Sequence, residues 1–404
     1  MPPTPTHPLA TPIDAGEYRE RRERLMAHPS AADVEASVWW GSHRVFYLSG
    51  FAFLPTERPL ALLITRDDTS TLFVPRLERE HAEAYAHVDR VSTYPEYPDF
   101  RHPMHHLADL MRDLGVERSF GGDGDGYPKT MGYGGPPLSE ASGATYTALE
   151  DTVESMMQVK SPAEITLVRE SAHWAGRAQR LLQERTREGR RETEVEVEVE
   201  ATATAELLDA YGDAYRPMAW GRNGPHAYYR GQIGSHSALP HSLNVNATFH
   251  AGDTLVNTAK CPMFGYMSEL ERTMFLGEPS VEQRHFFDHM RTLQDLAIDG
   301  CRAGRPCSSV DAAVRAYVAE HGLTPLWRHH TGHNIGIRYH EGPFLDVGDH
   351  TLMEPGMLFT VEPGLYVEGL GGFRHSDTIV VTSGEPEFLT SYPRDIERLT
   401  IPLA

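Results

Sequence analysis

The sequence predicts a two-domain protein, with an α/β domain in residues 1–155 and a second domain in residues 156–404. In the first part, short apolar runs bounded by turn residues alternate with segments whose apolar residues recur at helical spacing, which is typical of an α/β domain. Between the two parts, the segment MMQVKSP at 156–162 leads into a helix-start signal. The length of 404 residues suits two or three domains of ordinary size.

The elements of the first domain are placed by periodicity and by turn residues. A proline-rich arm, residues 1–14, is expected to be flexible. The pattern predicts a helix at 15–27, strands at 45–51 and 59–65, and a helix at 104–115. The turn RDDT joins the second of these strands to STLFVP, so we expect a hairpin there.

The second domain is expected to begin with a well-capped helix. Ser161 is a good N-cap, Pro162 suits the first helical position, and Glu164 completes a capping box. The segment at 193–212 is ambiguous, because its first half alternates like a strand and its second half has helical spacing.

Composition and charge exclude several classes of partner. A net charge of −20 leaves no basic surplus to neutralise phosphates, so nucleic acid and anionic membranes are disfavoured. No run of about 18 apolar residues is present, and the N-terminus lacks the pattern of a secretory signal. Three cysteines without metal-site spacing argue against a disulfide framework and favour a cytoplasmic location.

The segment from Arg328 to Gly364 is rich in groups that carry chemistry. It reads RHHTGHNIGIRYHEG and, after a short insert, EPGMLFTVEPG, so that histidines and carboxylates fall among glycines and prolines. These residues are His329, His333, His340, Glu354 and Glu362. Glycines allow tight turns, which let imidazoles converge on one point.

Two further segments carry paired polar residues on one face of a strand. In GYMSELERTMFLG, Glu269 and Glu271 are two residues apart and therefore project from the same face, whereas Leu270 projects from the other. In GLGGFRHSDTIVVT, Arg374 and Ser376 share one face in the same way.

These segments together resemble the pita-bread hydrolases, the family of aminopeptidase P, prolidase, methionine aminopeptidase and creatinase. The resemblance implies a creatinase-like α/β N-terminal domain followed by an α+β pita-bread catalytic domain, with a curved antiparallel sheet covered by helices. It implies that His333 and Glu362 face the active site, and that the ambiguous segment at 193–212 is a helix.

The resemblance also bears on metal binding. In the metallopeptidase members, five ligands build a two-metal site, and their positions fall on Thr258, Glu269, His333, Glu362 and Ser376 of this chain. Thr258 and Ser376 carry neutral hydroxyls, which are poor ligands for a divalent ion. We therefore expect no metal cofactor; the alternative is manganese, cobalt or zinc held by Glu269, His333 and Glu362.

The remaining residues are similar to those of creatinase, the metal-free branch of the family. That similarity implies catalytic roles for His241 as acid/base, with His333 nearby, and for Glu271 and Glu362, which grip a cationic substrate group. It also implies that Arg58 binds the substrate carboxylate from the neighbouring subunit of a homodimer. Further substrate contacts are expected from Glu269, His329, His340 and Arg374.

The match to creatinase is partial, because Phe344 and Met267 replace an arginine and a tyrosine that contact the substrate in that enzyme, and Ser376 replaces a histidine. The predicted function is therefore a metal-independent, creatinase-like hydrolase of a C–N bond in a small cationic or zwitterionic substrate. The first alternative is a metal-dependent Xaa-Pro aminopeptidase or dipeptidase acting on a dipeptide-like substrate. The second is a non-catalytic pita-bread module that binds peptides or proteins.

Overall fold

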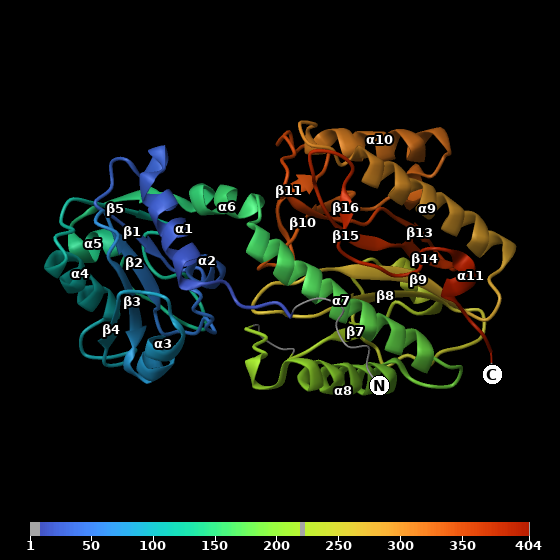
Figure 1. The fold of residues 1–404 in the computed structure, drawn as a ribbon, viewed down its shortest axis with the longest axis horizontal. Helices are drawn as coiled ribbons and strands as arrows, with labels where there is room; N and C mark the ends of the chain where they lie inside the picture. The colour runs from blue at the N-terminus through green and yellow to red at the C-terminus, as the bar shows by residue number, and fades with distance from the viewer. Residues whose placement is uncertain (1–8, 219–222, 404) are drawn as a thin grey trace. The chain divides into compact units, whose positions relative to one another are not determined.

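The computed structural model describes residues 9–218 and 223–403, which form two compact units (Figure 1). One unit spans Ile13–Met157, and the other starts at Gln158 and includes the described residues before Ile13. Residues 1–8 of the predicted flexible arm lie outside the described residues. The predicted domain boundary between residues 155 and 156 stays a prediction, two residues from the division between the units.

The first unit is built on a six-stranded mixed sheet with the order β4-β3-β2-β1-β5-β6. Its strands are β1 (Ala36–Trp39), β2 (Ala61–Thr65), β3 (Ser70–Pro75), β4 (Arg90–Tyr94), β5 (Ser119–Gly122) and β6 (Thr145–Ala148). Its helices are α1 (Ala15–Ala27), α2 (Ser42–Ser49), α3 (Arg79–Tyr85), α4 (Pro103–Asp113), α5 (Leu138–Ser142) and α6 (Glu150–Gln158). The antiparallel pairing of β2 with β3 confirms the predicted hairpin.

One prediction in this unit is wrong. The segment 45–51 was expected to be a strand but forms most of helix α2, which ends at Gly50 with φ 71°. The residues from Val45 to Leu48 are all buried, so the run is apolar on every side. A run that is buried all round carries no periodicity that separates a helix from a strand.

The second unit is built on a nine-stranded sheet. Seven of its strands follow the order β11-β10-β12-β15-β9-β8-β7, and the other two, β16 and β17, pair with β15 and β9. Its strands are β7 (His226–Tyr228), β8 (Thr254–Lys260), β9 (Leu270–Leu276), β10 (Gly332–Asn334), β11 (Glu341–Leu345), β12 (Leu358–Val361), β15 (Ser376–Val380), β16 (Glu387–Phe388) and β17 (Thr400–Ile401). A separate hairpin pairs β13 (Gly364–Val367) with β14 (Gly371–Arg374).

The helices of the second unit are α7 (Pro162–Arg185), α8 (Glu192–Tyr211), α9 (Val281–Gly300), α10 (Cys307–Glu320) and α11 (Ile396–Leu399). Helix α7 begins with the predicted capping box of Ser161 and Glu164, and α8 confirms the helix expected at 193–212. Figure 1 shows α7 and α8 beside β7 and β8, and α9 along β13 and β14. Within the described ranges, no helix combines the length and apolar character needed to cross a bilayer.

The apolar core of this unit lies between the sheet and these helices. Alternate strand residues such as Leu255, Leu270 and Phe359 join residues of α7 to α10 in one buried cluster. Because side chains alternate along a strand, the residues between them project from the opposite face of the sheet. That opposite face carries polar residues and is called the site face below.

Candidate active site

The register of the large sheet arranges the polar residues of the site face in rows. Tyr228, Thr258, Glu271 and Ser376 are successive partners across β7, β8, β9 and β15, and this set is called the Glu271 row. Directly paired residues of neighbouring strands have their Cβ atoms about 4.5–5.5 Å apart and share a face. Residues far apart in the sequence therefore meet because the strands are paired in this register.

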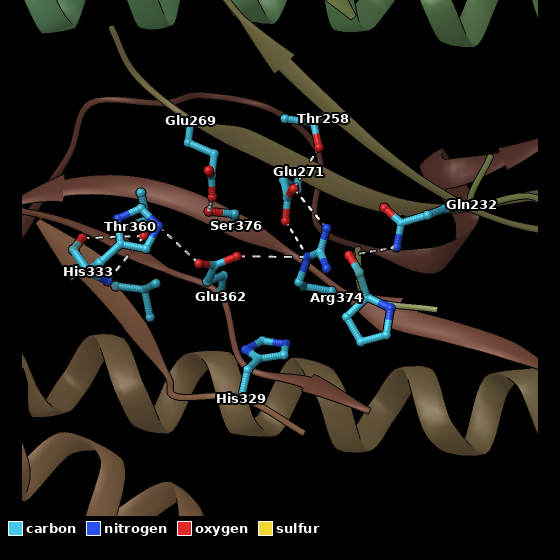
Figure 2. Close-up of polar contacts among 12 residues, drawn as sticks. Gln232, Thr258, Glu269, Glu271, His329, His333, Thr360, Glu362, Arg374 and Ser376 are labelled. Atoms are coloured by element: carbon cyan, nitrogen blue, oxygen red, sulfur yellow. Dashed lines mark hydrogen bonds and ion pairs between the residues drawn. The ribbon is translucent and has the colours of Figure 1, made fainter. Parts of the chain in front are cut away.

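Three ionisable side chains converge beside this row. One ligand atom from each of Glu269, His333 and Glu362 lies within 4.8 Å of the others, and these residues are called the Glu–His–Glu cluster (Figure 2). His333 Nε2 lies 3.2 Å from Glu362 Oε1. The Nδ1–H of His333 donates to the Asn334 carbonyl at 2.9 Å, so that Nε2 is the nitrogen presented to the carboxylates.

A glycine allows His333 to lie this close to Glu362. Gly332 pairs with Val361 of β12, and a Cβ atom at Gly332 would stand 2.0 Å from the Thr360 carbonyl oxygen. Any larger residue would therefore push β10 away from β12. The glycine before His333 in the TGH motif thus sets the spacing of the two strands that carry His333 and lead to Glu362.

Burial and mutual contact shift the pKa values of all three residues of the cluster. Burial, together with the charges of Glu362 and Glu271, raises the pKa of Glu269 to about 7. Burial alone would lower the pKa of His333, but contact with Glu362 outweighs it and raises that pKa to about 9. Burial opposes ionisation of Glu362 as well, yet His333 holds the pKa of Glu362 well below its usual range. Without a metal, His333 and Glu362 thus form a buried ion pair.

The negative charge of Glu271 in its row is balanced by the guanidinium of Arg374. Arg374 contacts both carboxylate oxygens of Glu271, and its Nη2–H donates to Oε1 at 2.8 Å. The Thr258 hydroxyl donates to the same Oε1 at 2.6 Å, and Arg374 Nη1–H donates to the Tyr366 hydroxyl at 2.9 Å. Burial disfavours the charged guanidinium, but Glu271 more than compensates and raises the pKa of Arg374 well above its ordinary value. This arginine is a fixed positive charge, 3.8 Å from Glu362 Oε2.

Two further histidines border the cluster. His329 Nδ1–H donates to the His330 carbonyl at 2.8 Å, so its Nε2 accepts a hydrogen bond from the Tyr366 hydroxyl at 2.7 Å. Burial lowers the pKa of His329, which keeps this imidazole neutral. His340 stacks on His333 with 4.0 Å between ring centroids, and burial with the nearby His333 lowers the pKa of His340 to about 4.

Most of the residues named from the sequence in the second unit lie together. The cluster, Glu271, Arg374, His329 and His340 are neighbours on the site face. His241 is exposed, and its charge adds to the burial and the His333 charge that lower the pKa of His340, so it lies at the border of the site. Arg58 belongs to the first unit, where it pairs with Glu96 at 2.7 Å and contacts Glu57. The proposed roles of His241 and Arg58 stay predictions.

Sequence reasoning did not single out Tyr366, Tyr339 or Lys260. Tyr366 links Arg374 to His329 and stands four residues after Glu362, so proximity in the sequence was an available signal. Lys260 and Tyr339 meet through tertiary contact, with Lys260 Nζ 4.0 Å from the Tyr339 ring centroid. Their only sequence signal was the position of Lys260, two residues after Thr258 on the same face of one strand.

The donor set fits one divalent cation and does not fit a pair. Glu269, His333 and Glu362 offer two carboxylates and one imidazole nitrogen, which is a common ligand combination. Glu271 is already engaged by Arg374 and Thr258. Ser376 is likewise engaged, because its hydroxyl donates to Glu269 Oε1 at 2.6 Å. A second ion would lack the negative oxygen ligands that hard cations require.

Comparison with known proteins identifies the family of both halves of the chain. A model of the metallopeptidase family M24 matches residues 166–383. A model of the creatinase/prolidase N-terminal domain matches residues 21–129.

Several relatives and solved structures match over nearly their whole length. The Xaa-Pro dipeptidase of Pyrococcus horikoshii is 26% identical over 385 residues, which cover 93% of this chain and 98% of that protein. The structure of Xaa-Pro dipeptidase from Bacillus anthracis is 26% identical with a TM-score of 0.79, over 96% of this chain and 100% of that one. The prolidase structure from Pyrococcus horikoshii has a TM-score of 0.77 at 24% identity, over 93% and 99% of the two chains, and shows the same fold.

These findings confirm the predicted family, the predicted α/β plus pita-bread fold and the predicted enzyme class, a hydrolase. They support the alternative of a metal-dependent Xaa-Pro dipeptidase better than the metal-independent, creatinase-like function predicted from the sequence. The expected absence of a metal cofactor finds no support in them.

Proposed function

Because the chain belongs to the metallopeptidase family M24, we propose that it hydrolyses the peptide bond of Xaa-Pro dipeptides or of similar small zwitterionic amides. The observation that carries this proposal is the Glu–His–Glu cluster, whose three ligand atoms lie within 4.8 Å of one another. Relatives named as Xaa-Pro dipeptidases, matched over nearly their full length, supply the substrate class. We propose further that the cluster holds one divalent cation, of manganese, cobalt or zinc.

The residues of the site would have different roles in the proposed reaction. A cation bound by Glu269, His333 and Glu362 would polarise the amide carbonyl and lower the pKa of a water molecule. Arg374 and Thr258 hold Glu271 in one position, so that its carboxylate is oriented before substrate arrives. The carboxylates of the site face attract the ammonium end of a zwitterion. His340, neutral at pH 7, offers a ring nitrogen for a hydrogen bond at the edge of the cluster.

A second candidate is the metal-independent, creatinase-like hydrolase. It is favoured by one observation, the replacement of two ligand positions by the hydroxyls of Thr258 and Ser376, each of which donates to a carboxylate. In this scheme His241 is the predicted acid/base, and Glu269, whose pKa is raised to about 7, is a second group that can exchange a proton with water. Glu271 and Glu362 would hold the cationic group of the substrate without an ion, with His333 3.2 Å from Glu362.

We also propose a cytoplasmic homodimer. Cys261, Cys301 and Cys307 are all free and buried, which suits a reducing compartment. The proposed substrate contact of Arg58 across subunits requires the dimer, and light scattering of the purified protein would measure its mass. A monomer would remove the role of Arg58 at a neighbouring site.

One experiment separates the two candidate functions. The protein is stripped with a chelator, and metal content, metal binding by calorimetry and proline release from Ala-Pro are measured during stepwise return of manganese, cobalt or zinc. The proposal expects activity to rise with bound metal and to saturate at one ion per chain. The exposed Glu354, changed to Gln, is the matched control and leaves both curves unchanged.

Other outcomes of the same experiment are equally informative. Full activity with less than a tenth of an equivalent of metal would replace the proposal by the metal-independent candidate. Saturation at two ions per chain would overturn the single-ion site. No release of proline from any Xaa-Pro dipeptide would remove the proposed substrate class.

A further inference from the structure

We propose that Lys260 binds the carboxylate of the substrate and thereby selects dipeptides with a free C-terminus. This inference deepens the proposed dipeptidase function and rests on it. Lys260 ends β8, two residues after Thr258, so both side chains project from the site face. Lys260 pairs with His226 of β7, in the row next to the Glu271 row.

The ammonium group of Lys260 is available for an anionic ligand. Nζ lies 4.0 Å from the centroid of the Tyr339 ring and 5.3 Å from that of Tyr228. In the described part of the chain, no carboxylate forms an ion pair with it, and the side chain is half-buried. The two rings position the ammonium by cation–π contacts while leaving it without a countercharge.

Arg374, a second cation of the site face, is already engaged by other side chains. Arg374 is 3% exposed, and its guanidinium contacts Glu271 and Tyr366. A substrate carboxylate near Arg374 would also meet the negative charges of Glu271 and Glu362. Like charges at short range repel, so the anionic end of a zwitterion is directed away from Arg374 and toward Lys260.

One aromatic ring contacts both Lys260 and the cluster. The Tyr339 centroid lies 4.0 Å from Lys260 Nζ and 6.2 Å from the centroid of the His333 ring. In an Xaa-Pro dipeptide the carboxylate is one residue, about 3.5 Å, from the scissile bond, so a carboxylate held by Lys260 leaves that bond near the Tyr339 ring and the cluster. The ammonium end of the same molecule then lies among carboxylates.

The substitution Lys260→Met keeps the length of the side chain and removes its charge. For Ala-Pro we expect KM to rise about 10- to 100-fold, as for loss of a charge-assisted hydrogen bond, with kcat changed less than about 3-fold. For Ala-prolinamide, which has no carboxylate, the wild type is expected to be poor and the variant no poorer. Lys260→Arg retains part of the preference, and the exposed Lys129→Met is the matched control.

A binding measurement keeps this inference separate from the proposed function. Calorimetry compares L-proline with L-prolinamide on the wild type and on Lys260→Met, with Lys260→Gln as a second variant and thermal melting as a check of folding. We expect the wild type to prefer the acid and both variants to lose that preference. If the wild type hydrolyses no Xaa-Pro dipeptide but shows this pattern, the proposed function fails and the carboxylate subsite stands. An equal loss for acid and amide, or no preference in the wild type, overturns the subsite.

Discussion

Two halves of the site face balance their carboxylates in different ways. In the Glu–His–Glu cluster, Glu269 and Glu362 face an imidazole that can give up its proton to make room for an ion. In the Glu271 row, the carboxylate is held by the guanidinium of Arg374, which cannot leave. The difference teaches that one sheet face can balance its acids either with an imidazole, which an ion could replace, or with a fixed guanidinium. The two halves also meet, because the Ser376 hydroxyl donates to Glu269 and Arg374 lies 3.8 Å from Glu362.

The largest effect is expected from Glu362→Gln. The change removes a ligand from the cluster and leaves His333 without its ion-pair partner. We expect metal binding to fall below detection by calorimetry and kcat to fall by about 10³-fold or more, as for loss of an electrostatic group at the reacting centre. Retention of more than a tenth of the wild-type kcat would contradict the assignment of the cluster as the centre of the chemistry.

The substitution Arg374→Met tests how the charge of Glu271 is balanced in the Glu271 row. Among the described residues it leaves the buried Glu271 with the Thr258 hydroxyl as its one remaining partner, so the free energy of unfolding in urea is expected to fall by about 3–5 kcal/mol. The double variant with Glu271→Gln should recover part of that loss. Arg118→Met breaks the exposed pair with Glu35 and serves as the control, with a loss below about 1 kcal/mol.

The double variant Thr258→Asp with Ser376→Glu is expected to convert the Glu271 row into a site for an ion. Two carboxylates would then flank Glu271 in its row, where the register places residues 258 and 376. We expect metal stoichiometry to rise from one to two ions per chain. At a metal concentration 100 times the Kd of the new site, binding should add about 2.7 kcal/mol of stability. A stoichiometry that stays at one would show that Arg374 excludes the second ion.

The smallest effect concerns pH in the metal-free protein. The pKa of His333 is raised from 6.5 to about 9, so its contribution to stability is full below pH 6.5 and is lost as pH rises through 9. Between pH 7.5 and 9.5 the free energy of unfolding should fall by on the order of 2 kcal/mol more in the wild type than in His333→Gln. Equal slopes in the two proteins would contradict the buried ion pair of His333 with Glu362.

Much of the fold and part of the site could be predicted because their signals are local. The capping box at Ser161, the hairpin around RDDT and the alternation of Glu269 and Glu271 each depend on residues a few positions apart. The strand expected at 45–51 was wrong because complete burial removes the periodic signal. The motif around His333 and Glu362 identified the family through residue types and spacing alone.

The rest of the site depends on pairing between distant strands. Tyr228, Thr258, Glu271 and Ser376 meet through the register of four strands, and a shift of one residue would turn each side chain to the other face. No local pattern reports that register. Lys260 and Tyr339 were missed for the same reason, since 79 positions of sequence separate two groups that are 4.0 Å apart.

The Glu271 row also has a consequence for how such an enzyme can change during evolution. Its members come from different strands yet are interchangeable neighbours, because cross-strand partners lie only about 5 Å apart. A carboxylate placed at position 258 or 376 would therefore enter the same region as the carboxylate of Glu271 without moving the backbone. A lineage can therefore pass from one charge arrangement to another by single substitutions within the row, while helices, strands and connections stay as they are.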